Sequence, residues 1–226
     1  MRIVAVIQAR MGSSRFPGKV LSKIGGRAML IHVAERARAI PGVHEIVVAT
    51  TVEPRDDAIV SMCRGAGIRW MRGSEADVLA RYVMAADATR ADVIIRLTSD
   101  CPLLDPTVVG LVLSGFLASS ARWYSSNVHP PTWFDGTDAE VFSRVALEEA
   151  ARCAGPEERE HVTTYFARAP WAPPNARVPG GEDHSALKLS VDTADDLDRV
   201  RRVHACLPSC GAFGWRETLA AYHAAF

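Results

Sequence analysis

Short runs of β-branched residues alternate with segments of helical periodicity along most of this chain. Between the runs, hydrophobic residues recur at helical spacing, as in residues 30–40 and 77–88. Strands separated by helices predict a mostly parallel sheet that is covered on both faces. The sequence therefore predicts an α/β fold, a three-layer sandwich with strands expected at 2–9, 45–50, 68–71, 92–97, 139–142 and 187–191.

The length of 226 residues suits a single domain spanning 1–226. Residues 123–136 differ from the rest because they are rich in proline, aromatic residues and asparagine, with little periodicity. Helices are expected at 144–153 and 156–167, followed by a second loop. We therefore expect a small inserted lobe at about 123–170.

The charge balance restricts the possible partners. Lys plus Arg and Asp plus Glu both total 26, so the formal net charge is zero. Nucleic acids and anionic membranes select a basic excess, so neither is an expected partner. The five cysteines include no Cys-x-x-Cys pair, which favours a reducing cytoplasm. His204, Cys206 and Cys210 fall short of the four ligands of a structural zinc site.

The segment after the first strand, residues 8–19, combines three cations with two glycines. Such a turn can bind phosphate, because glycine lets backbone N–H groups approach an anion and Arg or Lys neutralises its charge. Five residues separate Gly12 from Gly18 and Val20 follows Lys19, so this is not a P-loop, and the dinucleotide G-x-G-x-x-G is absent. A triphosphate site is the favoured interpretation, and a solvated basic loop is the alternative.

The same segment, QARMGSSRFPGKVL at 8–21, resembles the signature of the cytidylyltransferase family. Further matching blocks are RGSEADVLARY at 72–82, RLTSDCPLLDP at 96–106, and segments at 138–142, 159–163 and 191–197. The family includes CMP-KDO synthetase, acylneuraminate cytidylyltransferase and spore-coat polysaccharide biosynthesis protein F, and the last subgroup is the most similar. The resemblance implies a nucleotide-diphospho-sugar transferase-like fold, transfer of CMP from CTP to a sugar acid with release of pyrophosphate, Mg²⁺ as cofactor, and a homodimer.

The resemblance also implies roles for individual residues. Asp100 and Asp192 would hold the metal, although Asp100 could instead form an Asx turn and Asp192 could cap a helix. Asp77 and Arg81 could equally form a surface ion pair on one helix. The residues expected to act in catalysis are Arg10, Lys19 and Asp100, and those expected to bind the nucleotide are Ala9, Arg10, Gly12, Ser13, Arg15, Lys19, Arg72, Asp77 and Arg81.

The acceptor is expected to bind in the middle region. Polar side chains there could bind sugar hydroxyls, and Trp123, Tyr124 and Trp133 could stack on a sugar ring, or these aromatic residues could form a dimer surface. Ser99, Thr137 and Thr164 depart from the family pattern, which leaves the acceptor less defined than the nucleotide. The predicted acceptor-binding residues are Asn127, Asp138, Glu140, Glu160 and His161, with Asp135 as a further candidate.

Two other functions are compatible with such a sheet. A glycosyltransferase of the GT-A type would consume a nucleotide sugar, but its usual Asp-x-Asp motif is not evident and the cationic loop would be unexplained. A non-catalytic nucleotide-binding protein would not need both Asp100 and Asp192 beside Arg10 and Lys19. Neither function is implied by the resemblance.

Overall fold

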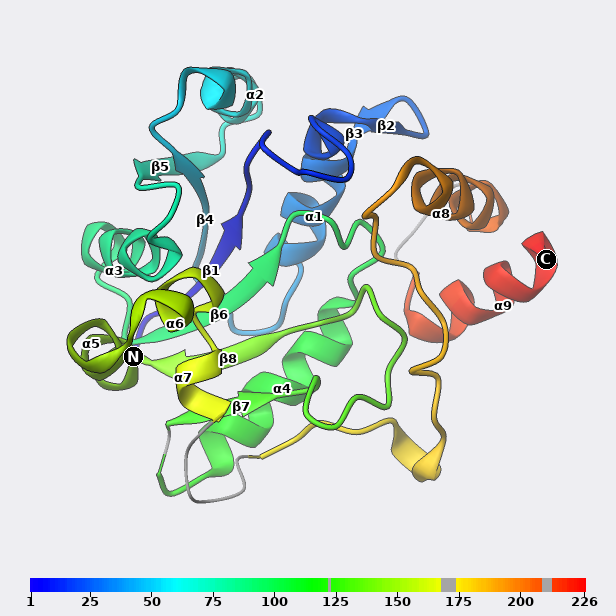
Figure 1. Ribbon diagram of the computed structural model, residues 1–226. Coiled ribbons are helices and arrows are strands. Elements are labelled where there is room, and N and C mark those ends of the chain that lie inside the picture. Colours follow the sequence, from blue (N-terminus) through cyan, green and yellow to red (C-terminus); the bar gives the residue numbers. More distant parts are fainter. Residues whose placement is uncertain (122, 168–173, 209–212) are drawn as a thin grey trace.

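A six-stranded sheet forms the centre of the computed structural model, which describes residues 1–121, 123–167, 174–208 and 213–226 (Figure 1). The strand order is β5-β4-β1-β6-β8-β7. β5 (Arg69–Gly73), β4 (Glu45–Thr51), β1 (Ile3–Gln8) and β6 (Val93–Thr98) run parallel. β8 (Glu140–Ser143) is antiparallel to β6 and to the edge strand β7 (Tyr124–Ser126). The predicted mostly parallel α/β architecture is confirmed.

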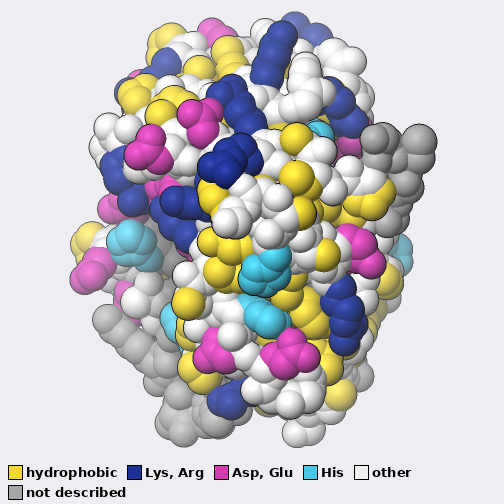
Figure 2. All heavy atoms as spheres, turned by 90° about the vertical axis from the view of Figure 1, so that its right-hand side faces the viewer, with side chains coloured by type: hydrophobic (Ala, Val, Ile, Leu, Met, Phe, Trp, Pro, Cys, Tyr) yellow, Lys and Arg dark blue, Asp and Glu magenta, His cyan; other side chains and the backbone are white. Residues whose placement is uncertain are grey.

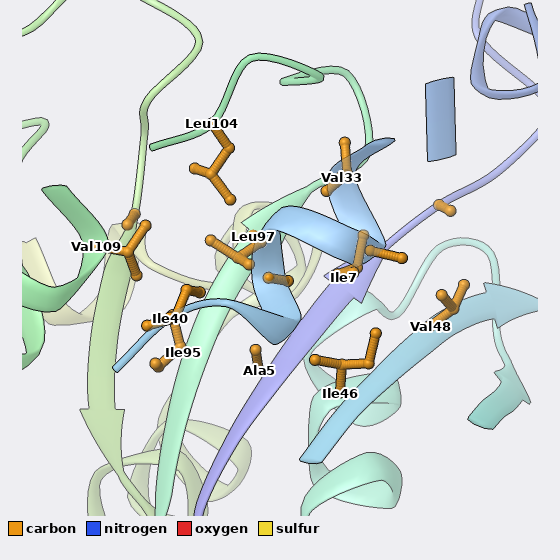
Figure 3. Packing of buried hydrophobic residues seen from close by; sticks show 14 of the residues in the cluster. Ala5, Ile7, Val33, Ile40, Ile46, Val48, Ile95, Leu97, Leu104 and Val109 are labelled. Carbon is orange, nitrogen blue, oxygen red and sulfur yellow. The ribbon is translucent and has the colours of Figure 1, made fainter. Parts of the chain in front are cut away.

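Both faces of the sheet are buried under helices. Side chains of β1 alternate between the faces, so Ala5 and Ile7 pack with α1 (Met29–Arg38), α2 (Asp57–Gly65) and α4 (Pro106–Ala118) (Figure 3). Val4 and Val6 pack on the other side with α3 (Val78–Thr89) and α5 (Arg144–Cys153). This double burial explains why the parallel strands are apolar along their whole length.

A third hydrophobic cluster lies beside the sheet, where α8 (Ala194–Cys206) packs against α9 (Trp215–Ala225) and against β2 (Lys23–Ile24), which forms a short hairpin with β3 (Arg27–Ala28). Trp133 belongs to this cluster: it is 2% exposed, donates Nε1–H to the Ala176 carbonyl and packs edge-on against Trp215. The predicted sugar-stacking role of Trp133 is therefore wrong. The surface on this side mixes cationic, acidic and hydrophobic side chains (Figure 2).

Three segments differ from the sequence-based expectations. Residues 187–191 form an isolated bridge between Lys188 and Asp135, not a strand. The expected helix 156–167 is divided into α6 (Pro156–His161) and α7 (Thr164–Ala167), because buried Val162 adopts φ +47°. β7 lies in the region expected to be irregular.

Three short 3₁₀ turns complete the described elements: η1 (Lys19–Leu21), η2 (Pro54–Asp56) and η3 (Pro179–Gly181). Cys210 of the disfavoured zinc set lies outside the described residues. Within the described ranges, no helix is both long and apolar enough to cross a membrane.

Candidate active site

The loop that follows β1 is closed by its own backbone. Gly18 adopts φ +74°, a conformation that glycine accepts without strain, and its N–H donates to the Met11 carbonyl at 2.9 Å. The carboxylate of Asp56 is fully buried and accepts the Met11 N–H at 2.7 Å, and it also accepts the Thr51 hydroxyl. The loop is thus tied to the end of β4, and Lys19 follows it in a fixed position.

Much of the backbone of this loop is already hydrogen-bonded within the protein. The N–H groups of Ser13 and Gly18 donate to the Met11 carbonyl, and the Lys19 N–H donates to the Phe16 carbonyl. The Phe16 N–H donates to the Ser13 hydroxyl at 3.3 Å. The loop therefore differs from a P-loop, in which successive backbone N–H groups cradle the phosphates.

Lys19 joins the loop to two carboxylates. Its ammonium lies 2.9 Å from Asp100 and 3.1 Å from Asp192, and it donates to the Val191 carbonyl at 2.6 Å. Asp100 follows the end of β6, and Asp192 directly precedes α8. The predicted cluster of Lys19, Asp100 and Asp192 is present, although the three residues are far apart in the sequence.

These contacts test the two structural roles that the sequence left open, an Asx turn at Asp100 and a helix cap at Asp192. Thr193 is the N-cap of α8, and its hydroxyl accepts the Asp196 N–H at 3.2 Å, so Asp192 is not needed as a cap. Asp100 accepts a hydrogen bond from the Lys19 ammonium and one from the Cys101 thiol at 3.7 Å, and within the described part of the chain no backbone N–H donates to its carboxylate. Among the described contacts, neither carboxylate is used by a helix cap or an Asx turn, and both instead face the cations around them.

The charge of Asp192 is stabilised by three cations. Arg15 lies 2.8 Å from its carboxylate, and Lys19 and Lys188 lie at 3.1 Å. Burial alone would raise the pKa of Asp192, but the hydrogen bonds and charges of Lys19 and Lys188 outweigh burial and lower it. Asp192 is accordingly ionised at neutral pH.

The donor set of Asp100 and Asp192 fits a hard divalent cation. Both side chains are partly open, at 26% and 20% exposure, and one oxygen of each lies within 3.1 Å of the Lys19 ammonium, which a bound cation would have to displace or share them with. Mg²⁺ takes one or two carboxylates and completes its shell with phosphate oxygens and water. Among the described residues, no group of three or more His, Cys, Asp or Glu forms a metal site, so the protein would supply two ligands and the substrate would supply others.

A hollow of about 280 Å³ opens over this cluster. Five of its lining side chains are Arg or Lys and three are acidic, so it suits an anionic ligand. Ten of the predicted site residues line it. The hollow is lined by Gln8, Ala9, Arg10, Ser13, Ser14, Arg15, Lys19, Val20, Val78, Arg81, Arg96, Thr98, Ser99, Asp100, Glu160, His161 and Asp192. We call it the cationic hollow.

Three predicted nucleotide-binding residues lie outside the lining of this hollow. Gly12 lies against Arg55 and Glu75, where an added Cβ would come within 2.9 Å of the Arg55 guanidinium. Arg72 donates to the carbonyls of Thr51 and Glu53 and pairs with Asp57. These contacts support the loop around the hollow.

Asp77 also lies outside the lining. It caps α3 by accepting the Ala80 N–H at 2.8 Å, and it pairs with Arg159 of α6 at 2.8 Å. Arg81 is 3% exposed and donates to the carbonyls of Ser74 and Glu75. The pairing of Asp77 with Arg159 joins the helix that carries Arg81 to the helix that carries Glu160 and His161.

A second hollow, of about 440 Å³, adjoins the first one and shares Arg96, Thr98, Asp100, His161 and Asp192 with it. Five of its lining residues are acidic and one is arginine. We call it the acidic hollow. It is lined by Arg96, Thr98, Asp100, Cys101, Val128, His129, Asp135, Asp138, Glu140, His161, Thr163, Thr164, Ser190 and Asp192.

The predicted acceptor-binding residues are distributed unequally. Asp138, Glu140 and His161 line the acidic hollow, whereas Glu160 lines the cationic hollow. Asn127 lines neither: it is 1% exposed, donates to the Thr137 carbonyl and accepts the Ala139 N–H, both at 2.9 Å. Its side chain holds the turn that carries Asp138.

Tyr124 lines neither hollow. It is 2% exposed, donates its hydroxyl to Glu140 at 2.5 Å and stacks on Phe166, so the predicted sugar-stacking role of Tyr124 is wrong. Trp123 packs against the core on the side of α3 and α5.

Two residues near the site were not singled out from the sequence. Asp56 positions the loop after β1, but in the sequence it resembles an ordinary acid in the first turn of a helix. Arg96 lines both hollows and pairs with buried Glu140 at 2.5 Å, and its buried Nε has no hydrogen-bond partner among the described residues. The sequence feature that could have identified Arg96 is its position as a charged residue within an otherwise apolar strand.

A larger hollow, of about 940 Å³, lies between α1 and α8 and away from Asp100. Its charged groups already have partners. Arg36 donates to the carbonyls of Leu104 and Phe213, and Asp105 accepts the N–H groups of Thr107 and Trp215. In the two smaller hollows, the charged side chains are less fully paired within the protein. These two hollows form the candidate active site.

Comparisons with known proteins agree with this assignment. A family model described as cytidylyltransferase matches residues 4–172. The spore coat polysaccharide biosynthesis protein SpsF of Bacillus subtilis is 31% identical over 216 residues, covering 89% of this chain and 86% of that protein. A 3-deoxy-manno-octulosonate cytidylyltransferase of Anaeromyxobacter dehalogenans is 31% identical over 240 residues, covering 89% and 97%.

One solved structure is similar to this chain over nearly its whole length. It is a cytidylyltransferase from Leptospira borgpetersenii, with a TM-score of 0.89, 31% identity, and coverage of 99% of this chain and 94% of that one. The matched residues include the loop after β1, β6 with Asp100, and the strands that carry the acidic hollow. The chain belongs to the cytidylyltransferase family, whose members are nucleotidyltransferases.

Proposed function

We propose that this enzyme transfers CMP from CTP to a hydroxyl group of a sugar acid and releases pyrophosphate. The acceptor oxygen forms a bond to the α-phosphorus, the bond from that phosphorus to the oxygen bridging to the β-phosphate breaks, and the hydroxyl proton passes to solvent. The observation that carries this proposal is the cluster of Lys19, Asp100 and Asp192 at the wall shared by the two hollows.

The triphosphate is assigned to the cationic hollow. Arg10 has one weak ion pair, 3.8 Å from Glu75, and Arg15 is 64% exposed, so both guanidinium groups can turn toward phosphate oxygens. Lys19 is fixed beside the carboxylates and would neutralise charge on the reacting phosphate. Phosphoryl transfer is accelerated mainly by such positioned charges.

Mg²⁺ is the proposed cofactor, held by Asp100 and Asp192. When bound there, the ion would polarise phosphate oxygens and stabilise the charge that develops on the leaving pyrophosphate. Lys19 and Lys188, which lower the pKa of Asp192, would keep it ionised in the absence of the ion. The carboxylates would thereby be ready to bind metal at neutral pH.

The sugar is assigned to the acidic hollow, because this hollow adjoins the position of the α-phosphate through Asp100. The names of the two curated relatives support a carbohydrate acceptor: one refers to spore coat polysaccharide and the other to 3-deoxy-manno-octulosonate. Asp138 and His161 would contact the acceptor, and Glu140 would act through Arg96. A homodimer remains a prediction, to be checked by light scattering after gel filtration.

The experiment is pyrophosphate release with Mg²⁺, comparing CTP with ATP, GTP and UTP over a panel of sugar acids. Release with CTP and one class of acceptor supports the proposal. Release from a nucleotide sugar would favour a glycosyltransferase of the GT-A type. A rise in melting temperature with CTP but no turnover would favour a non-catalytic nucleotide-binding protein, and no response to CTP would overturn the proposal.

A further inference from the structure

The cationic hollow has two ends with different chemistry. Its lining extends from Val78 and Arg81 on α3 to Asp192 before α8, and these two helices lie on opposite sides of β1 and β6 in Figure 1. Lys19 and Asp100 lie with Asp192, at the end assigned to the triphosphate and the metal. The nucleoside of a bound CTP would therefore extend toward α3.

Gln8 presents its side chain at the α3 end. It is the last residue of β1 and lines the hollow. Side chains alternate along a strand, so Gln8 points to the same face as Val4 and Val6, which pack with α3. The Tyr82 hydroxyl of α3 donates to the Gln8 Oε1 at 3.2 Å. This bond holds the amide of Gln8 beside α3.

Tyr82 determines which atom of the amide is left for a ligand. Tyr82 is completely buried, and burial raises the pKa of its phenol well above its usual range, so the hydroxyl keeps its proton. A buried hydroxyl needs an acceptor, and among the described residues Gln8 is the acceptor that it has. The Gln8 amide nitrogen has no hydrogen-bond partner in the described part of the chain, and Gln8 is only partly buried where it lines the hollow. Its N–H groups are therefore free to meet a ligand.

The backbone around Gln8 offers little to a nucleobase, because bonds of the sheet already use it. The Gln8 carbonyl accepts the Ser99 N–H at 3.2 Å, and the Ala9 N–H donates to the Ala49 carbonyl at 3.1 Å. The guanidinium of Arg81 donates to two loop carbonyls. A base at this end of the hollow would therefore be distinguished mainly by side chains, and the Gln8 amide supplies a free donor there.

We propose that Gln8, oriented by Tyr82, selects cytosine over uracil by donating a hydrogen bond to the ring nitrogen N3. This inference rests on the proposed function and names a specificity-determining residue of its nucleotide site. N3 of cytosine is an acceptor, whereas N3 of uracil carries a hydrogen, so a donor held at this position matches the first base and opposes the second. The amide cannot turn its oxygen toward uracil without leaving the buried Tyr82 hydroxyl unpaired, which is unfavourable.

A purely structural role for Gln8 is the competing explanation. The amide would then serve only as the acceptor of the Tyr82 hydroxyl. That role needs one oxygen, and a glutamate would supply it equally well, because a carboxylate also accepts from a hydroxyl. Gln8→Glu separates the two explanations, since it keeps an oxygen beside Tyr82 and replaces the amide donor with an acceptor.

The experiment measures the dissociation constants of CTP and UTP by calorimetry, with Mg²⁺ and without an acceptor. The two nucleotides carry the same triphosphate, so the ratio of their constants reports on the base. We expect the parent chain to prefer CTP by about tenfold or more, and Gln8→Glu to abolish or reverse this preference. The added negative charge of the glutamate repels both nucleotides alike and cancels in the ratio.

Tyr82→Phe tests the orienting role. Without the hydroxyl, the Gln8 amide can rotate and present either its nitrogen or its oxygen, so the preference for CTP should fall to about threefold or less. Tyr165→Phe is the matched control. It removes a hydroxyl that donates to Glu149 at 3.1 Å, outside the lining of both hollows, and it should leave the preference unchanged.

A nucleotide analogue tests the parent chain without any substitution. 3-Deazacytidine triphosphate has a C–H group in place of N3 and is otherwise the same as CTP. It should bind to the parent chain about tenfold more weakly than CTP, because the hydrogen bond from Gln8 is lost. Gln8→Glu should show no preference for CTP over the analogue.

The outcomes that overturn the inference are distinct from failure of the proposed function. Equal binding of CTP and the 3-deaza analogue by the parent chain would overturn the inference, as would a parental ratio of CTP to UTP affinity in Gln8→Glu. No pyrophosphate from CTP with any acceptor would overturn the proposed function, and the binding ratios would still decide the role of Gln8. No binding of either nucleotide by the parent chain would overturn both.

Discussion

The cationic and acidic hollows share a wall but have opposite charge. Five Arg or Lys side chains line the first one, and five Asp or Glu side chains line the second. Arg96, Asp100 and Asp192 belong to both. Under the proposed function, this difference would keep two ligands apart by charge, with the triphosphate in the cationic hollow and the acceptor in the acidic hollow.

The two hollows also differ in how the chain builds them. Nearly half of the lining of the cationic hollow comes from one continuous segment, the end of β1 and the loop after it, and the rest comes from α3, the end of β6, α6 and Asp192. The acidic hollow combines the ends of β6 and β8 with segments near residues 128–138, 161–164 and 190–192. A local signature can thus reveal the first hollow, whereas the second depends on the tertiary fold.

The largest effect is expected at the shared wall. Asp100→Asn should lower the rate of pyrophosphate release by about 10³-fold, because it removes a charged ligand of the proposed metal. The measurement is kcat with CTP and the preferred acceptor at saturating Mg²⁺. Asp198→Asn is the matched control, and near-parental turnover in Asp100→Asn would show that the shared wall is not the reaction centre.

A glycine in the acidic half offers a structural test. Gly136 has φ +120°, and an added Cβ would lie 2.8 Å from the Leu189 carbonyl carbon. Gly136→Ala should cost about 3 kcal/mol of unfolding free energy, from backbone strain and overpacking together. The measurement is urea denaturation.

The control for that test is Gly180→Ala, where φ is +82° but no atom lies within 4 Å of the added Cβ. It should cost about 1 kcal/mol, from strain alone. Equal losses in the two variants would mean that the close contact between the turn at Gly136 and residues 187–191 does not matter for stability.

Lys19→Ala tests the cationic half. Loss of the ammonium should weaken CTP binding by about 10- to 100-fold, because a hydrogen bond to a charged group is removed. Calorimetry with CTP measures this change, and Lys23→Ala, on the exposed hairpin, serves as the control. Unchanged CTP affinity in Lys19→Ala would place the triphosphate elsewhere.

The smallest predicted effect concerns Asp138 and pH. The pKa of Asp138 is raised from 3.8 to about 7 by burial and by neighbouring acids. Between these values the folded state keeps a proton that the unfolded state has lost, so the contribution of Asp138 to stability falls as pH rises toward 7. Asp138→Asn should therefore raise the unfolding free energy by about 2 kcal/mol at pH 8.

The same substitution should have little effect at pH 4, where the folded carboxyl is neutral and its penalty is small. Urea denaturation at both pH values measures the difference. A gain of equal size at pH 4 and pH 8 would contradict the assignment of an uncompensated charge to the acidic hollow.

The sequence predicted the parallel core well, because its strands are apolar on both faces and its helices show clear periodicity. It predicted the cluster of Lys19, Asp100 and Asp192 through the family resemblance. It placed Trp133 wrongly, since composition cannot distinguish a buried tryptophan from an exposed one. Residues 187–191 have the composition of a strand, but they bond to the turn at Asp135 and not to the edge of the sheet.

The polar residues of the middle region were the hardest to assign. Asn127 follows β7 and Asp138 precedes β8, and both are polar residues of similar size, yet the Asn127 side chain bonds to two backbone groups whereas the Asp138 carboxylate has no hydrogen bond or ion pair with a described residue. The different roles of Asn127 and Asp138 depend on hydrogen bonds between residues 10 to 12 positions apart. Spacing within the sequence does not reveal such bonds.

The internal hydrogen bonds of the loop after β1 have a consequence for how nucleotide binding responds to salt. Met11, Ser13, Phe16, Gly18 and Lys19 all use their N–H groups inside the protein. In the proposed nucleotide site, phosphate would therefore be held largely by the side-chain charges of Arg10, Arg15 and Lys19. Added electrolyte screens such contacts at exposed positions, so CTP affinity should decline with ionic strength more steeply than in proteins whose backbone amides enclose the phosphates.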